Sequence, residues 1–251
     1  MRWGRGYGLA VTVAAMLLAW QLASWGLRSE VLPGPAEVIV VFFRSLGKGG
    51  LAVDLGVSAY RVVVSILLSV AIAAPLGLAL GLNQRLYSLT APLVYLSFPI
   101  PKIVLLPILL MFLGVGDSSK IAVIFLILFF QVLVVVRDAA GSVRPELVHS
   151  VRSLGAGWGN LLRYVFFPAS LPALLTALRI SVGTALAVLF FVESFGTTSG
   201  LGYFILVKGW GRLAYPEMYA GVMAMALLGL ALYFGLELLE RKSCAWLQAG
   251  R

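Results

Sequence analysis

The sequence is poor in the residues from which proteins build metal centres, disulfides and water-facing surfaces. Among its 251 residues there is one cysteine, Cys244, and one histidine, His149, and only 12% of the residues are charged. A single cysteine excludes an intramolecular disulfide and a cysteine-only metal site, and a single histidine excludes a histidine-rich metal centre. So few charges cannot cover the surface of a water-soluble domain. The sequence therefore predicts a protein that folds in a lipid bilayer.

Hydrophobic residues make up 61% of the chain, and the mean hydropathy is +1.01. The formal net charge is +9, from 19 Lys and Arg residues against 10 Asp and Glu residues. In a soluble protein this excess would indicate nucleic acid as a partner. Here the basic residues are scattered between apolar runs, which is typical of residues that anchor and orient membrane helices. We therefore expect membrane lipid, and no nucleic acid, around this chain.

Six apolar runs approach the roughly 20 residues that a helix needs to cross a bilayer. They lie at about residues 6–27, 60–83, 89–113, 119–137, 171–193 and 216–238. The first is uncharged over the 22 residues from Gly6 to Leu27, which is longer than the core of a typical secretory signal. We interpret it as a retained span, with cleavage near Ala23 or Ser24 as the alternative. The sequence thus predicts an all-α integral membrane protein with six transmembrane helices.

An even number of spans places both termini on one side of the membrane. With cytoplasmic termini, ten Lys and Arg residues lie inside and seven outside, while Lys102 and Arg179 fall within spans. The outer segments are also longer, so the density of basic residues favours cytoplasmic termini. We predict a multi-pass protein of the plasma or inner membrane, with the loop 144–168 in the cytoplasm. Between Leu32 and Leu55, apolar residues at helical spacing predict a short amphipathic helix on the outer surface.

The loop between the fourth and fifth spans is polar, basic and patterned as two short helices. Pro145 suits the first turn of a helix, and Gly155-Ala156-Gly157 allows a sharp turn after it. One apolar stripe precedes this corner and another follows it, ending at Pro168 and Pro172, which are expected to close the second helix. The stripes comprise Leu147, Val151 and Leu154, then Trp158, Leu161, Leu162 and Val165. Such a corner can dock on a partner protein; the alternative is a plain basic linker.

The third span carries a lysine beside two prolines. Pro99 and Pro101 are expected to interrupt the helix, and irregular backbone at membrane depth is tolerated where it lines a cavity. Lys102 would add a positive charge to that lining, which suits the pathway of an anion. The alternative is that Lys102 reaches an interface or pairs within the bundle.

Glu193, near the outer end of the fifth span, is a second charge in a costly position. It either forms a structural ion pair with Arg61 or Lys120, or acts as a gate or a contact for the solute. In the second span, Gly77 and Gly81 form a small-residue seam for close helix packing. The sequence does not distinguish an internal seam from one between two copies of the chain.

The cytoplasmic loop resembles a known signature. Gly155, followed after nine residues by Val165-Phe166-Phe167-Pro168, has the spacing of the coupling loop in permeases of ABC importers. Further matches follow in order along about residues 30–240: LPGP at 32–35, SAYRV at 58–62, PIPKIVLLPILLMFLGVG at 99–116, SKI at 119–121, Glu193, and GLGY at 200–203. The chain is therefore similar to the permease subunits of binding-protein-dependent ABC importers of the sulfonate, taurine and nitrate type.

The resemblance implies a type I ABC importer permease fold, with a cytoplasmic coupling helix between helices four and five. It divides the chain into an N-terminal span with an external segment (1–54), a transmembrane core (55–240) that contains the coupling loop (144–168), and a cytoplasmic tail (241–251). It also implies a homodimer, two cytoplasmic ATPase subunits that hold ATP and magnesium, and an extracytoplasmic solute-binding protein. The chain itself has no Gly-x-x-x-x-Gly-Lys-Ser/Thr phosphate loop, so we expect no bound cofactor, no metal and no catalysis here.

The residues that the resemblance assigns to ATPase coupling are Glu146, His149, Ser150, Val151, Gly155, Trp158, Val165 and Pro168. The chain departs from the signature at one place, since His149, Ser150 and Val151 stand where the family has Glu-Ala-Ala. Glu146 lies three residues earlier and is a candidate substitute for the missing acid. The partner ATPase is therefore expected to offer a different complement at this point.

The leading prediction is an ATP-driven importer permease for a small anion such as a sulfonate, taurine, nitrate or bicarbonate. One alternative is the import of a vitamin or pyrimidine precursor by the same machinery. Another is a self-contained secondary transporter or channel, with Lys102 and Glu193 in the pathway. An intramembrane enzyme is disfavoured because the sequence has no HExxH motif, no paired aspartates and no nucleophile motif.

Overall fold

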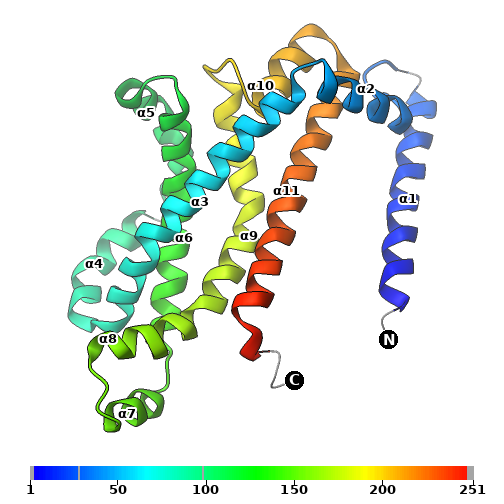
Figure 1. The fold of residues 1–251 in the computed structure, drawn as a ribbon. Coiled ribbons are helices and arrows are strands. Elements are labelled where there is room, and N and C mark those ends of the chain that lie inside the picture. The colour runs from blue at the N-terminus through cyan, green and yellow to red at the C-terminus, as the bar shows by residue number, and fades with distance from the viewer. Residues whose placement is uncertain (1–2, 28, 98, 248–251) are drawn as a thin grey trace. The chain divides into compact units, whose positions relative to one another are not determined.

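The computed structural model describes residues 3–27, 29–97 and 99–247, and within these ranges the chain forms helices and short connections without a strand (Figure 1). Five helical segments of the described chain are long and apolar enough to cross a membrane. They are Ala10–Leu27 within α1 (Trp3–Leu27), α3 (Leu51–Leu82), α6 (Asp117–Gly141), the run Trp158–Ser194 that contains α9 (Phe167–Ser194), and α11 (Tyr215–Ser243). The predicted all-helical membrane fold is confirmed.

The third predicted span is bent. Helix α4 (Gln84–Ser97) and the following pair, η1 (Lys102–Leu105) and α5 (Leu106–Leu113), pass the same test together but meet at 81°. The break contains Pro99 and Pro101, which lack the backbone N–H that a continuing helix requires and disfavour helical geometry at the residue before them. Counted as one broken span, the pair brings the number to six.

The chain divides into two compact units. The first comprises residues 1–57 with 193–226 and contains α1, α2 (Pro35–Gly47), the start of α3 and the start of α11. Along the chain just before α11, this unit also contains α10 (Leu201–Tyr203), the π-helical segment η3 (Phe204–Gly209) and the 3₁₀ turn η4 (Trp210–Arg212). The amphipathic helix predicted after the first span is α2, but α3 begins at Leu51, earlier than the sequence indicated.

Apolar side chains and ring contacts stabilise the first unit. Val38 of α2, Leu51 of α3 and Leu201 of α10 are completely buried. Helix α1 joins them through Trp20, whose indole N–H donates to the Pro33 carbonyl at 3.1 Å and whose ring lies 5.9 Å from that of Tyr219. A half-buried aromatic with a satisfied polar atom is an effective anchor between helices.

The second unit comprises residues 58–192 with 227–251. It contains the rest of α3, helices α4 to α6, the loop helices α7 (Pro145–Ser153) and α8 (Trp158–Leu161), the π-helical segment η2 (Leu162–Phe166), α9 up to Val192, and the end of α11. Its main core is formed by α3, α6 and α9, with Ala73, Val132 and Leu178 among the buried residues.

Small residues let α3 and α6 approach closely. A side chain at Gly77 would meet the carbonyl oxygen of Leu133 at 2.8 Å, and one at Gly81 would overlap the carbonyl oxygen of Arg137. About two turns earlier in α3, the Ser69 hydroxyl donates to the Phe125 carbonyl of α6 at 3.3 Å. The glycine seam noticed in the sequence therefore belongs to an internal α3–α6 contact.

Candidate functional site: the helical corner and the broken span

The corner predicted from the sequence is present between α6 and α9. Helix α7 begins with Pro145 in its first turn and ends before Gly155, whose φ is +82°. This left-handed conformation is strained for any residue with a Cβ, which explains the glycine. The Gly155 N–H bonds to the Arg152 carbonyl at 2.9 Å and the Ala156 N–H to the Val151 carbonyl at 3.4 Å. The Ser153 hydroxyl donates to the Ser150 carbonyl at 2.8 Å, so backbone and side chain together close the helix C-terminus.

The faces of α7 differ from the predicted single stripe. Val148 and Val151 pack against a small core of Leu161, Val165 and Phe166. Leu147 and Leu154 instead remain 50% and 86% exposed. Val148 and Val151 are three positions apart and therefore share the face of α7 that packs on this core. Leu147 and Leu154 lie outside that face and stay on the open side.

The polar members of the predicted coupling set lie on the exposed surface of the corner. Glu146, His149 and Ser150 are all exposed on α7. Trp158, at the start of α8, is 52% exposed although its ring lies 6.2 Å from that of Phe166. Val165 is buried in the small core behind α7. The arrangement offers a partner both apolar and polar contacts.

The second half of the loop is longer than predicted, because neither proline ends it. Pro168 is the second residue of α9, and Pro172 lies inside that helix. The π-helical segment η2 lies directly before Pro168 and joins α8 to α9 without a break. A π-bulge is a local irregularity inside a continuing helix, and a proline close to it lacks the N–H of a regular ladder. Movement of the corner can therefore pass directly into α9.

Lys102 lies at the bend of the broken span. Its ammonium donates a hydrogen bond to the Ser97 carbonyl at the end of α4 and lies 4.9 Å above the ring of Phe130 in α6. A helix C-terminus and an aromatic face both attract a cation. Pro99 and Pro101 are exposed on either side of the same bend.

Glu193 belongs to the first unit and is completely buried. Its carboxylate accepts a hydrogen bond from the Gly202 N–H at 3.0 Å and lies against Gly200, whose φ is +113°. A second buried carboxylate, that of Asp54, accepts from the Gly200 N–H at 2.9 Å and from the Lys208 ammonium at 2.7 Å. The two acids fix the backbone of the loop after α9.

Asp54 and Lys208 were not recognised as a pair from the sequence. The only signal was an acidic residue in the first turn of an otherwise apolar helix, with a Gly-Leu-Gly motif far along the chain. In the parts of the chain that the structure describes, there is no group of three or more His, Cys, Asp or Glu residues that could hold a metal ion.

Long apolar helices, a broken span and an exposed helical corner are the features expected of the membrane-spanning subunit of a transporter. Residues 56–243 match the family of binding-protein-dependent transport system inner membrane components, and the chain belongs to this family. It is the permease subunit of an ABC importer, as the resemblance of its loop predicted.

Curated relatives match nearly the whole chain. It is 30% identical over 255 residues to the taurine transport system permease protein TauC of Escherichia coli, which covers 98% of this chain and 92% of that protein. It is 28% identical to the putative aliphatic sulfonates transport permease protein SsuC of Bacillus subtilis, covering 97% and 88%. It is also 28% identical to the formylaminopyrimidine transport permease protein ThiX of Halalkalibacterium halodurans, covering 92% of each.

A solved structure shares the fold. The MetNI methionine ABC transporter, in an inward-facing conformation, matches with a TM-score of 0.64 at 19% identity and covers 77% of this chain and 95% of the matched one. The predicted type I permease fold is confirmed by this likeness.

Proposed function

We propose that this chain forms the membrane pathway of an importer for small organic sulfonates such as taurine. The observation that carries the proposal is the similarity to the taurine permease, which extends over 98% of the chain. Similarity to a sulfonate permease supports the same class of solute, and Lys102 would supply a positive charge near the pathway. Formylaminopyrimidine import remains the second candidate, favoured by the similarity to ThiX.

Energy for transport comes from a cytoplasmic ATPase that binds ATP and magnesium, while this chain carries out no covalent chemistry. Its exposed corner, with Leu147 and Leu154 on the open side, is the docking surface for that ATPase. Closure of two ATPase subunits would displace two such corners, one on each of two copies of the chain. Because α8, η2 and α9 are continuous, that displacement would shift the bundle between its inward- and outward-facing states.

The missing Glu-Ala-Ala residues change the expected contact and not the docking itself. His149 and Ser150 are both exposed, so they are available to an ATPase surface. Glu146, also exposed, lies almost one turn earlier on α7. On the opposite side of the membrane, an extracytoplasmic binding protein would deliver the solute and dominate selectivity.

The test is purification of the tagged chain from its native membrane, followed by reconstitution with whatever accompanies it. We expect an ATPase subunit at two-to-two stoichiometry, and ATP hydrolysis that rises when taurine-loaded binding protein is added. Stimulation by a pyrimidine precursor in place of taurine would move the assignment to the second candidate. Recovery of the chain alone, together with solute flux in ATP-free liposomes, would contradict an ATP-driven importer.

A further inference from the structure

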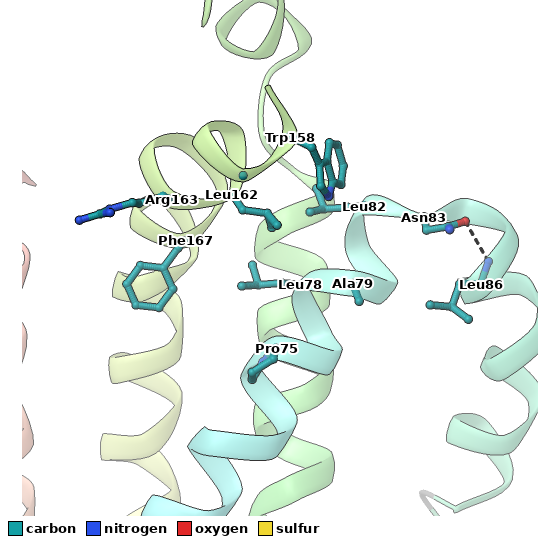
Figure 2. A pocket seen from close by; sticks show the side chains of 11 residues that line it. Pro75, Leu78, Ala79, Leu82, Asn83, Leu86, Trp158, Leu162, Arg163 and Phe167 are labelled. Atoms are coloured by element: carbon teal, nitrogen blue, oxygen red, sulfur yellow. Dashed lines mark hydrogen bonds between the residues drawn. The ribbon is translucent and has the colours of Figure 1, made fainter. Parts of the chain in front are cut away.

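A large apolar cavity lies directly behind the coupling corner, within the second unit. Its volume is about 520 Å³, and it is bounded by the end of α3, the start of α4, α8, η2 and the start of α9 (Figure 2). Leu78 and Leu82 line it from α3, and Trp158, Leu162 and Phe167 line it from the opposite elements. Nearly every lining side chain is apolar, so water gains few partners inside.

The position of the cavity along α3 places it at the boundary between hydrocarbon and water. Helix α3 is uncharged from Val62 to its end at Leu82, and Arg85 is the first charge that follows. Trp158, which lines the cavity opposite α3, is 52% exposed, and Tyr164, next to the lining residue Arg163, is 65% exposed. Aromatic and basic side chains gather at this depth in membrane proteins because their rings and charges match the headgroup region.

A positive charge stands at one edge of this apolar space. Arg163 lines the cavity but its side chain extends away from Leu78 and Leu82 (Figure 2). The guanidinium is exposed and lies 5.6 Å from the ring of Tyr164. A ligand that fits would therefore have an apolar part in contact with the leucines and an anionic part just outside, a combination found in a phospholipid.

We propose that this cavity binds an acyl chain of an anionic phospholipid, whose phosphate pairs with Arg163. Basic pockets between helices at a membrane surface recognise anionic headgroups, and arginine pairs well with phosphate. The bound chain would touch both α3 and the coupling segment, and so would fill the space between the moving corner and the bundle. This site goes beyond the proposed function and does not depend on which solute is carried.

The test compares lipid binding by the purified, full-length transporter in mild detergent. Dioleoyl phosphatidylglycerol and dioleoyl phosphatidylcholine are titrated, and bound lipid is counted by native mass spectrometry. Ala79→Phe adds bulk from an exposed lining position, and Arg163→Gln removes the charge. Arg152→Gln, an exposed arginine on α7 outside the lining, is the matched control.

We expect phosphatidylglycerol to bind more tightly than phosphatidylcholine. Arg163→Gln should weaken phosphatidylglycerol binding about tenfold, as loss of a charged hydrogen bond predicts. Ala79→Phe should abolish the tight binding of both lipids, while Arg152→Gln should leave it unchanged. Because Trp158 lines the cavity, phosphatidylglycerol brominated on its acyl chain should quench tryptophan fluorescence, and Trp158→Phe should remove that component.

Three results would overturn the proposal. Equal lipid binding by all variants would show that the cavity is empty of lipid. Loss of both lipids with Ala79→Phe, but no effect of Arg163→Gln, would show an acyl site without recognition of the headgroup. Lipid that binds the chain alone but is absent from the complex with its ATPase would identify the ATPase as the occupant.

Discussion

At the scale of single residues, three basic side chains in or near the spans lie beside opposite charges. Arg61 forms a 2.6 Å ion pair with Asp117, Arg179 lies 3.2 Å from Glu240, and Lys208 pairs with Asp54. Unpaired charges are expensive at such depths, so pairing is the expected solution. The sequence revealed the charges but not these partners, because the paired residues are 56 or more positions apart.

The Asp54–Lys208 pair should stabilise the loop that follows α9. Because Asp54 is buried and also accepts from Gly200, Asp54→Asn should lower the thermal unfolding temperature by several degrees. Adding Lys208→Met to the Asp54→Asn variant should cost less stability than Lys208→Met alone, with a coupling energy of about 0.5–3 kcal/mol. Thermal unfolding of the four proteins in detergent measures this energy. Additive effects would show that the pair contributes no stability.

Lys102 should affect the solute and not the ATPase. Replacing its ammonium by the apolar side chain in Lys102→Met removes the positive charge at the bend of the broken span. We expect taurine uptake in proteoliposomes to fall at least severalfold, while the ATPase still co-purifies. Lys102→Arg keeps the charge and should retain most of the uptake. If Lys102→Met left the affinity and rate for the anion unchanged, Lys102 would have only a structural role.

At the scale of helices, the contact between α3 and α6 follows a repeat of small residues. Ser65, Ser69, Ala73, Gly77 and Gly81 recur every four positions along α3 and are buried or nearly so. Residues at this spacing share one helix face, and small side chains there let the backbones approach. The glycines predicted a seam; only the structure assigned it to α6, since a small-residue stripe does not specify its partner.

Adding a methyl group to this seam should destabilise the bundle. In Gly77→Ala the new Cβ would lie 2.9 Å from the Val136 side chain and 2.8 Å from the Leu133 carbonyl, so the helices must separate. Overpacking of this kind typically costs about 1–3 kcal/mol, more than the gain in helix propensity. Gly235→Ala in α11, where a Cβ meets nothing, is the control and should be neutral or stabilising. Their unfolding temperatures in detergent should therefore shift in opposite directions, or only that of Gly77→Ala should fall.

The coupling corner depends on the backbone conformation of Gly155. Its φ of +82° is strained for a β-branched residue, whereas no neighbour lies within 4 Å of a Cβ placed there. Gly155→Val should therefore alter the turn without a packing clash and abolish ATPase co-purification while the chain still inserts. Gly157→Ala, at a φ of −75°, should assemble normally. Wild-type levels of ATPase binding by Gly155→Val would exclude this corner as the docking element.

The same corner shows where sequence patterns stop being sufficient. Pro145 and Gly155 marked the bounds of α7 because each imposes a local backbone geometry. Pro168 was misread as an end, because a π-helical segment before it joins α8 to α9, and no local pattern announces such a segment. The exposure of Leu147 likewise depends on the core behind α7, which is formed by residues of the following segment.

At the scale of the whole molecule, hydropathy was enough to find the spans because a bilayer requires long apolar helices. Their bounds and bends depend on contacts that hydropathy does not contain. Helix α3, for example, begins at Leu51 and includes Asp54, whose charge is tolerated because Lys208 neutralises it. The distribution of basic residues predicts the orientation across the membrane. Because the chain has a single cysteine, one substitution gives a cysteine-free background in which labelling can test this prediction.

Cys244 should react slowly, since burial, with a smaller contribution from the Glu240 carboxylate, raises the pKa of its thiol and lowers the thiolate fraction at neutral pH. In a Cys244→Ser background, new cysteines at Ser150 and Thr198 would occupy exposed positions, one on α7 and one in the loop after α9. A membrane-impermeant maleimide applied to intact cells should label the cysteine at position 198 and not that at position 150. Permeabilised cells should label both. Labelling of position 150 alone in intact cells would invert the orientation and place the corner where no cytoplasmic ATPase can reach it.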